Sequence, residues 1–256
     1  MMELIDTHSH LEEIQDLHES IERAEKSGVS AIIAVGMNYE SNQRTLKISG
    51  TYGHMVVYPA LGIHPWNLDI SQRESNLNLI VENIREIVAI GEIGLDYWLK
   101  ETRKDHSKRE LQKEVFKDLL DLSKHHRKPA IIHCRGAWED AMDLVRQAEI
   151  KKAVFHWYSG PMEILEKILD YGYHISATPA AEYSEKHQAA IIRTPLERLL
   201  LETDSPVEYQ GKRSEPSHVL KTLEAVARIK DISREQVAKV TTKNAIEFFN
   251  LESNQY

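Results

Sequence analysis

The stretch MELIDTHSH, residues 2–10, joins a short apolar run to His8 and His10. Side chains two residues apart leave a strand on the same face, so both imidazoles can point at one place. A His-x-His pair by itself is a weak signal, because it is also found as a purely structural pair. The same pattern, an apolar run that ends on a nitrogen or oxygen donor, recurs along the chain and predicts a repeated strand unit with functional residues at its ends.

Four further segments follow this pattern, each with one donor at the end of a separate apolar run. They are IVAIGEIGLD (87–96) with Glu92, PAIIHCRG (129–136) with His133, AVFHWYSG (153–160) with His156, and RLLLETDSP (198–206) with Asp204. Six donors placed in this way are too many for chance. They indicate a metal-dependent hydrolase.

Length and composition set the limits of the interpretation. The chain has 256 residues, of which 41% are apolar and 28% charged, enough for one sizeable core and an ordinary polar surface. An α/β barrel usually has about 250 residues. No Pro/Gly/Ser-rich linker and no sequence repeat divides the chain, so we expect a single domain over residues 1–256.

The sequence constrains the cellular compartment and the binding partners less tightly than it constrains the fold. The chain has no apolar run of membrane-spanning length and no signal peptide, and its single cysteine, Cys134, fits a reducing compartment, so a cytoplasmic protein is expected. The net charge of −8 argues against a large basic surface for duplex DNA. It leaves a nucleic-acid substrate open, because bound divalent cations reverse the field inside a carboxylate-lined pocket.

Eight short apolar runs alternate with amphipathic segments, which predicts a parallel sheet with helices outside it. The predicted strands are Leu4–Thr7, Ala31–Val35, Val56–Leu61, Val88–Gly91, Ala130–His133, Ala153–His156, His174–Ala177 and Arg198–Glu202. The clearest helices are Ser107–His126, Glu163–Tyr171, Ser184–Ile192, Val219–Arg228 and Arg234–Phe249.

This eightfold alternation favours a TIM-like (β/α)₈ barrel over an open doubly wound sheet, for which the chain lacks a glycine-rich phosphate loop. In a barrel, the carboxyl ends of all strands surround one mouth. Donors more than a hundred residues apart can therefore meet there.

Four histidines and two carboxylates exceed the three protein ligands of a mononuclear catalytic zinc, and they suit two divalent cations about 3.5–4 Å apart. Glu92 is the candidate bridge between the cations, since it lies alone on its strand between Gly91 and Gly94, which would leave room for metal and substrate. The alternative is a core carboxylate paired with an arginine. Asp204 would ligate one metal and accept a proton from the attacking water, or else cap a turn before Pro206. Mg²⁺, Mn²⁺ and Zn²⁺ all remain possible identities.

Two more polar residues follow strand ends. His64 precedes Pro65, and Arg135 shares the parity of His133, so Arg135 can point into the site and bind a phosphate, or form a structural salt bridge. Asp6 lies deeper and suits a hydrogen bond behind the ligands. Four aromatic residues, Tyr97, Trp98, Trp157 and Tyr158, could stack bases, although packing at the barrel rim is the preferred interpretation.

The chain resembles the TatD family of metal-dependent hydrolases over nearly its whole length. The resemblance runs through DTHSHL, GIHP, IGEIGLDY, IIHCR, FHWYSG and LLLETDSP. It implies a (β/α)₈ barrel, metal ligands at the six donors named above, a phosphate-contacting role for His64 and Arg135, and divalent-metal-dependent deoxyribonuclease activity, often as an exonuclease. Gly136, Trp157-Tyr158 and Ser214 depart from the family pattern beside the substrate cleft, so they bear on substrate identity.

We therefore expect a two-metal phosphodiester hydrolase, most simply a 3′–5′ type deoxyribonuclease acting on single-stranded DNA ends. Arg135, Lys212 and Arg213 would hold a few phosphates. The alternatives are a metallohydrolase of another bond, such as a D-aminoacyl-tRNA deacylase or an amidohydrolase, and a metal-binding protein without turnover. No obligate protein partner and no membrane association is expected.

Overall fold

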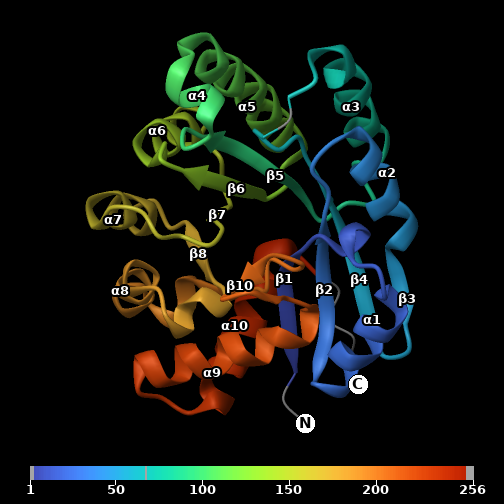
Figure 1. Ribbon diagram of the computed structural model, residues 1–256, viewed down its shortest axis with the longest axis vertical. Helices are drawn as coiled ribbons and strands as arrows, with labels where there is room; N and C mark the ends of the chain where they lie inside the picture. The colour runs from blue at the N-terminus through green and yellow to red at the C-terminus, as the bar shows by residue number, and fades with distance from the viewer. Residues whose placement is uncertain (1–2, 67, 252–256) are drawn as a thin grey trace.

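Eight parallel strands curve into a barrel in the computed structural model, which describes residues 3–66 and 68–251 (Figure 1). The ends of the predicted domain, residues 1 and 256, lie outside the described residues. The barrel strands are β1 (Leu4–Ser9), β2 (Val29–Val35), β4 (Met55–Leu61), β5 (Ala89–Asp96), β6 (Ala130–Arg135), β7 (Ala153–Phe155), β8 (His174–Ala177) and β9 (Leu199–Leu201). They pair in this order, which confirms the predicted strand sequence and the TIM-like fold.

Helices follow the strands and cover the outside of the barrel. They are α1 (Leu17–Lys26), α2 (Tyr39–Ile48), α3 (Ile70–Glu82), α4 (Lys100–Lys104), α5 (His106–His126), α6 (Trp138–Gln147), α7 (Met162–Asp170), α8 (Glu185–Arg193), α9 (Val219–Lys230) and α10 (Arg234–Phe249). All five helices that the sequence predicts are present, within two residues at each end. Among the described residues, no helix is both long and apolar enough to cross a membrane.

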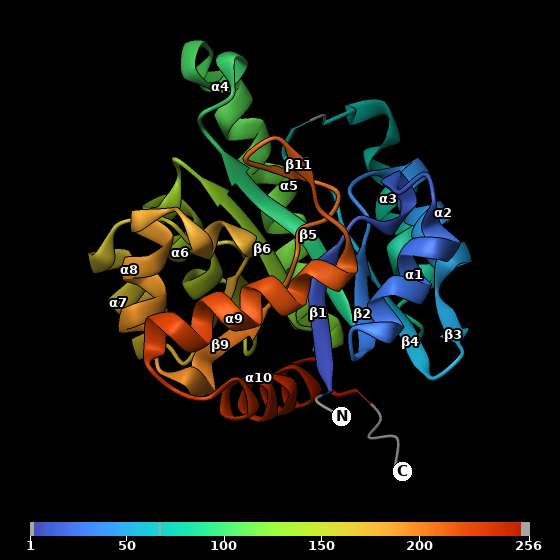
Figure 2. The same cartoon turned by 60° about the horizontal axis from the view of Figure 1, so that its bottom comes forward.

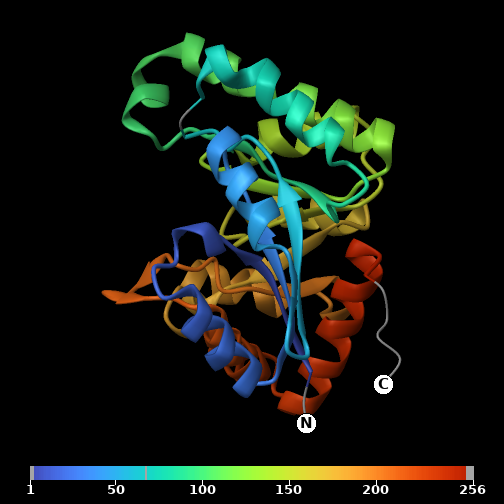
Figure 3. The same ribbon diagram turned by 90° about the vertical axis from the view of Figure 1, so that its right-hand side faces the viewer.

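Three short strands were not predicted. Strand β3 (Gly50–Tyr52) pairs antiparallel with β4 outside the barrel, and β10 (Glu208–Tyr209) pairs with β11 (Lys212–Arg213) as a hairpin. The hairpin turn is formed by Gln210 and Gly211, both with positive φ. Such two-residue turns favour Asn or Asp before Gly, so Gln-Gly is a weak sequence signal. In Figure 3 the orange β10–β11 hairpin and the green α4 segment project on the same side of the molecule.

The barrel closes between β1 and β9 with little strand pairing. Ser9 bridges Ser205 beyond the end of β9, the Asp204 amide donates to the His8 carbonyl oxygen at 2.9 Å, and the His10 amide donates to Ser205 at 2.7 Å. The buried Asp6 carboxylate adds to this seam, because it accepts hydrogen bonds from the Thr203 amide at 2.9 Å and hydroxyl at 2.6 Å. Asp6 also accepts a hydrogen bond from the His8 amide at 3.4 Å, so the predicted hydrogen bond behind the ligands is present and Asp6 helps to close the barrel as well.

The interior of the barrel is apolar at one end and polar at the other. Inward side chains of the strands, among them Ile5, Ile131, Val154 and Leu200, pack with Phe248 of α10. Helix α10 lies across the end where β1 begins (Figure 2). Because this end is filled, the polar residues gather at the opposite end, where the strands finish.

Candidate metal centre

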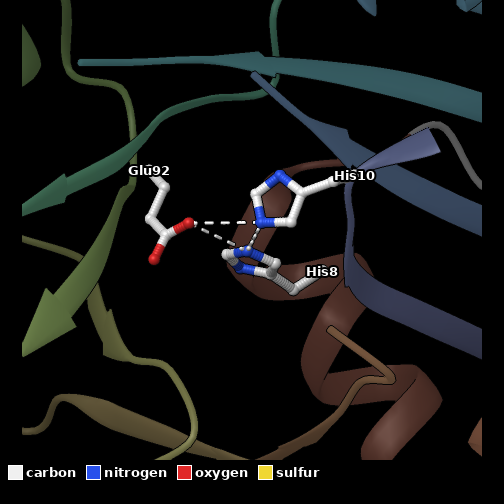
Figure 4. Close-up of side chains that lie close together, drawn as sticks. All are labelled: His8, His10 and Glu92. Atoms are coloured by element: carbon white, nitrogen blue, oxygen red, sulfur yellow. Dashed lines mark hydrogen bonds and ion pairs between the residues drawn. The ribbon is translucent and has the colours of Figure 1, made fainter. Parts of the chain in front are cut away.

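His8, His10, Glu92 and Asp204 meet at the mouth of the barrel. The Nε2 atom of His8 lies 3.3 Å from Nε2 of His10 and 3.3 Å from Oε2 of Glu92, and His10 Nε2 lies 3.4 Å from the same oxygen (Figure 4). Oδ1 of Asp204 is 3.6 Å from His8 Nε2 and 3.5 Å from His10 Nε2. Donor atoms around one ion, each about 2.0–2.2 Å from it, have this mutual spacing.

The second oxygen of Glu92 faces a different set of histidines. Oε1 lies 2.8 Å from Nδ1 of His133, 2.9 Å from Nε2 of His156 and 3.2 Å from Nε2 of His64. One carboxylate therefore directs one oxygen to His8 and His10 and the other oxygen to His133 and His156. The structure brings together all six residues that the sequence predicts as ligands, with His64 beside them.

Hydrogen bonds on the outer side of the rings fix which nitrogen faces the site. Nδ1 of His10 lies 2.8 Å from the Val35 carbonyl oxygen, which only accepts, so Nδ1 carries a proton and Nε2 faces inward, where its lone pair can ligate a metal when the ring is neutral. His133 is held by its Nε2 against Asp96 at 3.2 Å, and His156 by its Nδ1 against Glu202 at 3.3 Å. Outer carboxylates and carbonyls of this kind are typical of metal-ligating histidines.

His64 has the opposite arrangement. Its Nδ1 accepts a hydrogen bond from the Trp66 amide at 3.2 Å, so its proton is on Nε2, the nitrogen that faces Glu92. Burial lowers the pKa of His64 to about 4, which keeps the ring neutral. A ring nitrogen that carries a proton cannot ligate a metal, so His64 is placed as a hydrogen-bond donor at the edge of the site.

Asp96 and Glu202 belong to the site although the sequence analysis did not select them. Both are at most 1% exposed. Oδ2 of Asp96 accepts from Arg135 and Trp66 as well as from His133, and Oε1 of Glu202 accepts from the Trp157 amide as well as from His156. The spacing in the sequence could have identified both residues. Asp96 is four residues after Glu92, and Glu202 is two residues before Asp204, so each is an even number of positions from a predicted ligand.

The histidines and carboxylates of the site shift each other's pKa values through hydrogen bonds and charge. Burial would lower the pKa of His10, but hydrogen bonds to Asp204 and Glu92 raise it well above its usual value. His156 is also buried, yet the charge of Glu92 and the bond to Glu202 raise its pKa well above the usual range. Burial would raise the pKa of Asp204, but the hydrogen bond from His10 and nearby imidazoles lower it to about 2. Burial would raise the pKa of Glu92 too, but the surrounding imidazoles lower it well below its usual value, so Glu92 and Asp204 can hold cations in place of these protons.

The glycines around Glu92 make room for the protein itself, which corrects the prediction that they leave space for metal and substrate. A Cβ atom at Gly91 would lie 2.5 Å from the Ile131 side chain, and one at Gly94 would lie 2.0 Å from the His133 carbonyl oxygen. Gly62 is needed in the same way, since its Cβ would lie 2.4 Å from the Glu92 carbonyl oxygen. These glycines let β4, β5 and β6 approach closely enough to bring Glu92 and His133 together.

A cavity of about 760 Å³ opens over the centre. Its walls include Arg135, whose Nε donates to Asp96 at 2.8 Å and whose side chain is 41% exposed, so the predicted salt bridge exists and the rest of the guanidinium still reaches the cavity. Arg213 of β11 lines the cavity as well, whereas Lys212 is exposed on the hairpin. The half-buried Cys134 is part of the wall, and burial raises the pKa of its thiol.

The four predicted rim aromatics divide into two pairs. Tyr158 is 2% exposed and donates to the Pro161 carbonyl, and the Tyr97 hydroxyl donates to Asp140, so both are packing residues as preferred. Trp98 and Trp157 line the cavity instead. Trp66, which the sequence analysis did not select, joins them there.

Known proteins resemble the chain over nearly its full length. The family described as TatD related DNase matches residues 5–250. The metal-dependent hydrolase YabD of Bacillus subtilis is 34% identical over 262 residues, with 97% of this chain and 99% of YabD covered. Deoxyribonuclease TATDN3 of Homo sapiens is 30% identical, with 96% and 94% covered. The crystal structure of YjjV, a TatD homologue from Escherichia coli K12, superposes with a TM-score of 0.87 at 25% identity, covering 97% and 98% of the two chains.

Proposed function

The chain is a metal-dependent hydrolase of the TatD related DNase family, and from this premise we propose that it hydrolyses phosphodiester bonds in DNA with two divalent cations. The observation that carries the proposal is the division of the Glu92 carboxylate between two histidine sets. A carboxylate that directs one oxygen to each of two donor groups is suited to bridge a pair of cations.

The residues would divide into two groups around Glu92. His8, His10 and Asp204 would hold one cation with Oε2 of Glu92, whereas His133 and His156 would hold the other with Oε1. Two divalent cations in such a centre lower the pKa of water and stabilise negative charge on the phosphoryl oxygens.

The protein side chains would then orient the substrate and move the proton. Asp204, ionised and at the edge of the cavity, accepts the proton of the attacking water. The Nε2–H of His64 would donate a hydrogen bond to a phosphate oxygen while the ring stays neutral, and the terminal nitrogens of Arg135 would bind the phosphate. Asp96 and Glu202 hold His133 and His156 in the orientation that the cations require.

DNA is the proposed substrate because a relative that aligns with 96% of the chain is named a deoxyribonuclease. We propose that digestion starts from a single-stranded end, because a net charge of −8 does not favour a long electrostatic groove for duplex DNA. The proposed direction of digestion is 3′–5′. The proposal includes a cytoplasmic location, because the single cysteine fits a reducing compartment, and it requires no protein partner.

The test is a comparison of DNA substrates that differ in their ends. Metal-reconstituted protein should shorten a 5′-labelled single strand stepwise, should stop at a blocked 3′ end, and should cleave duplex DNA more slowly. Asp204→Asn, prepared in parallel, should leave every substrate intact. Rapid cleavage of closed circular DNA would reject the end-directed mechanism. Absence of cleavage of any DNA by protein that holds both metals would reject DNA as substrate in favour of D-aminoacyl-tRNA or amides.

A further inference from the structure

Two large aromatic side chains are exposed at the mouth beside the metal centre. Trp66 is 45% exposed and Trp98 is 48% exposed, and both line the cavity that contains His133 and Arg135. Indoles are normally buried for much of their area, so two of them open to one cavity indicate a surface that a flat ligand covers.

Trp66 is held in place before any ligand arrives. Its Nε1 donates to Oδ2 of the buried Asp96 at 2.7 Å. The ring stands on edge against His64, with centroids 4.7 Å apart and planes at 85°. A fixed indole loses little conformational entropy when a ligand stacks on it.

Trp98 is fixed from the neighbouring strand end. Its amide donates to Oδ1 of Asp96 at 2.9 Å, and its ring stands on edge against Trp138, with centroids 5.7 Å apart. The ring also lies against Gly136, where a Cβ atom would be 2.3 Å from it. A side chain at position 136 would therefore displace Trp98, which gives the glycine at this position a structural reason.

Arg135 lies next to both indoles. Its Nε bonds to the same Asp96 oxygen as Trp66 does, and its guanidinium carbon is 5.5 Å from the centre of the Trp66 ring. Within the described part of the chain, the terminal guanidinium nitrogens have no hydrogen-bond acceptor. Position 135 is followed directly by Gly136, on which Trp98 rests. Asp96 thus binds the Arg135 guanidinium, the Trp66 indole and the backbone amide of Trp98, and we call these three residues the Trp66–Arg135–Trp98 rim.

We propose that the Trp66–Arg135–Trp98 rim is a subsite for two consecutive unpaired nucleotides, in which the indoles stack the bases on either side of a phosphate held by Arg135. The inference rests on the proposed function and specifies which part of the substrate is recognised. Every base has a flat face, so stacking on indoles tolerates any sequence but requires that the base is not paired. The subsite accordingly selects single-stranded DNA over duplex.

Binding of a dinucleotide tests the subsite independently of turnover. The probes are the dinucleotide pdApdA and the same backbone with both bases missing, titrated into metal-loaded protein by calorimetry. Stacking of one base on one indole strengthens binding about 5- to 100-fold, so wild-type protein should bind pdApdA at least about 10-fold more tightly than the base-free probe. Trp66→Ala and Trp98→Ala should each reduce this preference, and the double variant should abolish it.

Two controls separate stacking from general damage. Trp66→Phe keeps a ring but removes the bond to Asp96, so it should retain most of the preference. Tyr171→Ala removes an aromatic residue that is 52% exposed outside the cavity, and it should change nothing. Equal affinity of wild-type protein for both probes, or a preference that survives in the double variant, would overturn the proposal. If the preference is present but no DNA is cleaved, the subsite stands and the nuclease proposal fails.

Discussion

At the scale of single residues, the direction of each imidazole proton separates the candidate ligands from their neighbour. The outer nitrogens of His10, His133 and His156 face oxygen acceptors, which leaves a lone pair directed at the cavity. His64 receives a backbone amide on its outer nitrogen and therefore presents a proton instead. These four of the five histidines around Glu92 thus differ in function: three can ligate a metal, and His64 can donate a hydrogen bond.

This difference predicts unequal effects of two alanine substitutions. His133→Ala should remove one of the two bound cations, because a ligand is lost. His64→Ala should leave two cations bound while slowing turnover about 10²- to 10³-fold, the range expected when one hydrogen-bond donor to the developing charge is lost. Metal content of dialysed protein by mass spectrometry checks both. A stoichiometry that falls by one in His64→Ala would show that His64 is a ligand.

Protonation of the ligand histidines predicts a pH-dependent gap between metal-bound and metal-free stability. The pKa values of His10 and His156 are raised in the metal-free fold, so the stability they contribute is fully present below about pH 6.5 and is lost as pH rises through their folded pKa values. Metal binding needs neutral imidazoles and therefore strengthens over the same interval.

The melting temperature of metal-loaded protein should consequently exceed that of chelator-treated protein by a margin that grows between about pH 6.5 and pH 9. Paired thermal melts across this interval measure the margin, and His10→Ala should flatten its pH dependence. A margin that is constant or shrinks with rising pH would contradict the proton assignment.

At the scale of strands and helices, regular alternation decides which site residues can be predicted from sequence. In β6, β7 and β9 an apolar inward residue is followed two or four places later by a donor, as in Ile131 and His133, and parity identifies the donor. In β1 the interior residue Ile5 and the donor His8 are three apart, across a register irregularity, so parity does not identify the donor there.

Contacts between strands were harder to predict than the strands. The partner of Arg135 is Asp96 because β5 and β6 pair in that register, beyond the predicted ends of both strands. The predicted β5 ended at Gly91, since two glycines and two acidic residues interrupt its apolar run. Glycine is needed at these positions because the neighbouring strands approach closely, and the sequence alone does not show how closely they approach.

Close approach of β4 to β5 makes Gly62 a test of how the strands position the site. Gly62→Ala places a Cβ atom 2.4 Å from the Glu92 carbonyl oxygen, so the backbone of Glu92 must move. We expect metal affinity to fall at least about 10-fold, as for other changes that misorient a ligand. Calorimetric metal titration measures this. Gly50→Ala is the control for backbone strain away from the site, because the φ of +144° at Gly50 disfavours alanine although no atom lies within 4 Å of the added Cβ. Unchanged affinity in Gly62→Ala would contradict the requirement for close approach.

At the scale of the whole molecule, the fold places six distant donors at one mouth while the surface stays acidic. The eight strands and the barrel could be predicted, because apolar runs and strand–helix alternation are properties of short segments. The closure of β1 against β9 could not, because it depends on hydrogen bonds between residues far apart in the chain, and the β10–β11 hairpin could not, because its Gln210-Gly211 turn is a weak sequence signal. The hairpin is the element that brings Arg213 to the cavity wall, with the exposed Lys212 beside it in sequence.

A net charge of −8 with few cations near the mouth predicts a shallow salt dependence of DNA binding. With three or four phosphates neutralised, the log–log slope on single strands should be about −2 to −3. Lys212→Ala and Arg213→Ala should each make the slope less negative by about 0.7, whereas Lys239→Ala, on α10 at the closed end, should leave it unchanged. Fluorescence anisotropy of a labelled oligonucleotide at several salt concentrations measures the slope. A slope near −8 would indicate an extended basic groove and would contradict the prediction.

Anomalous scattering from crystals grown with Mn²⁺ is the most direct test of whether Glu92 bridges a pair of cations. We predict two peaks about 3.5–4 Å apart on either side of the Glu92 carboxylate, one beside His8 and His10 and the other beside His133 and His156. Crystals of Glu92→Gln should lose at least one peak while the barrel is preserved. A single peak that Glu92 does not contact, or peaks outside the mouth of the barrel, would contradict the claim.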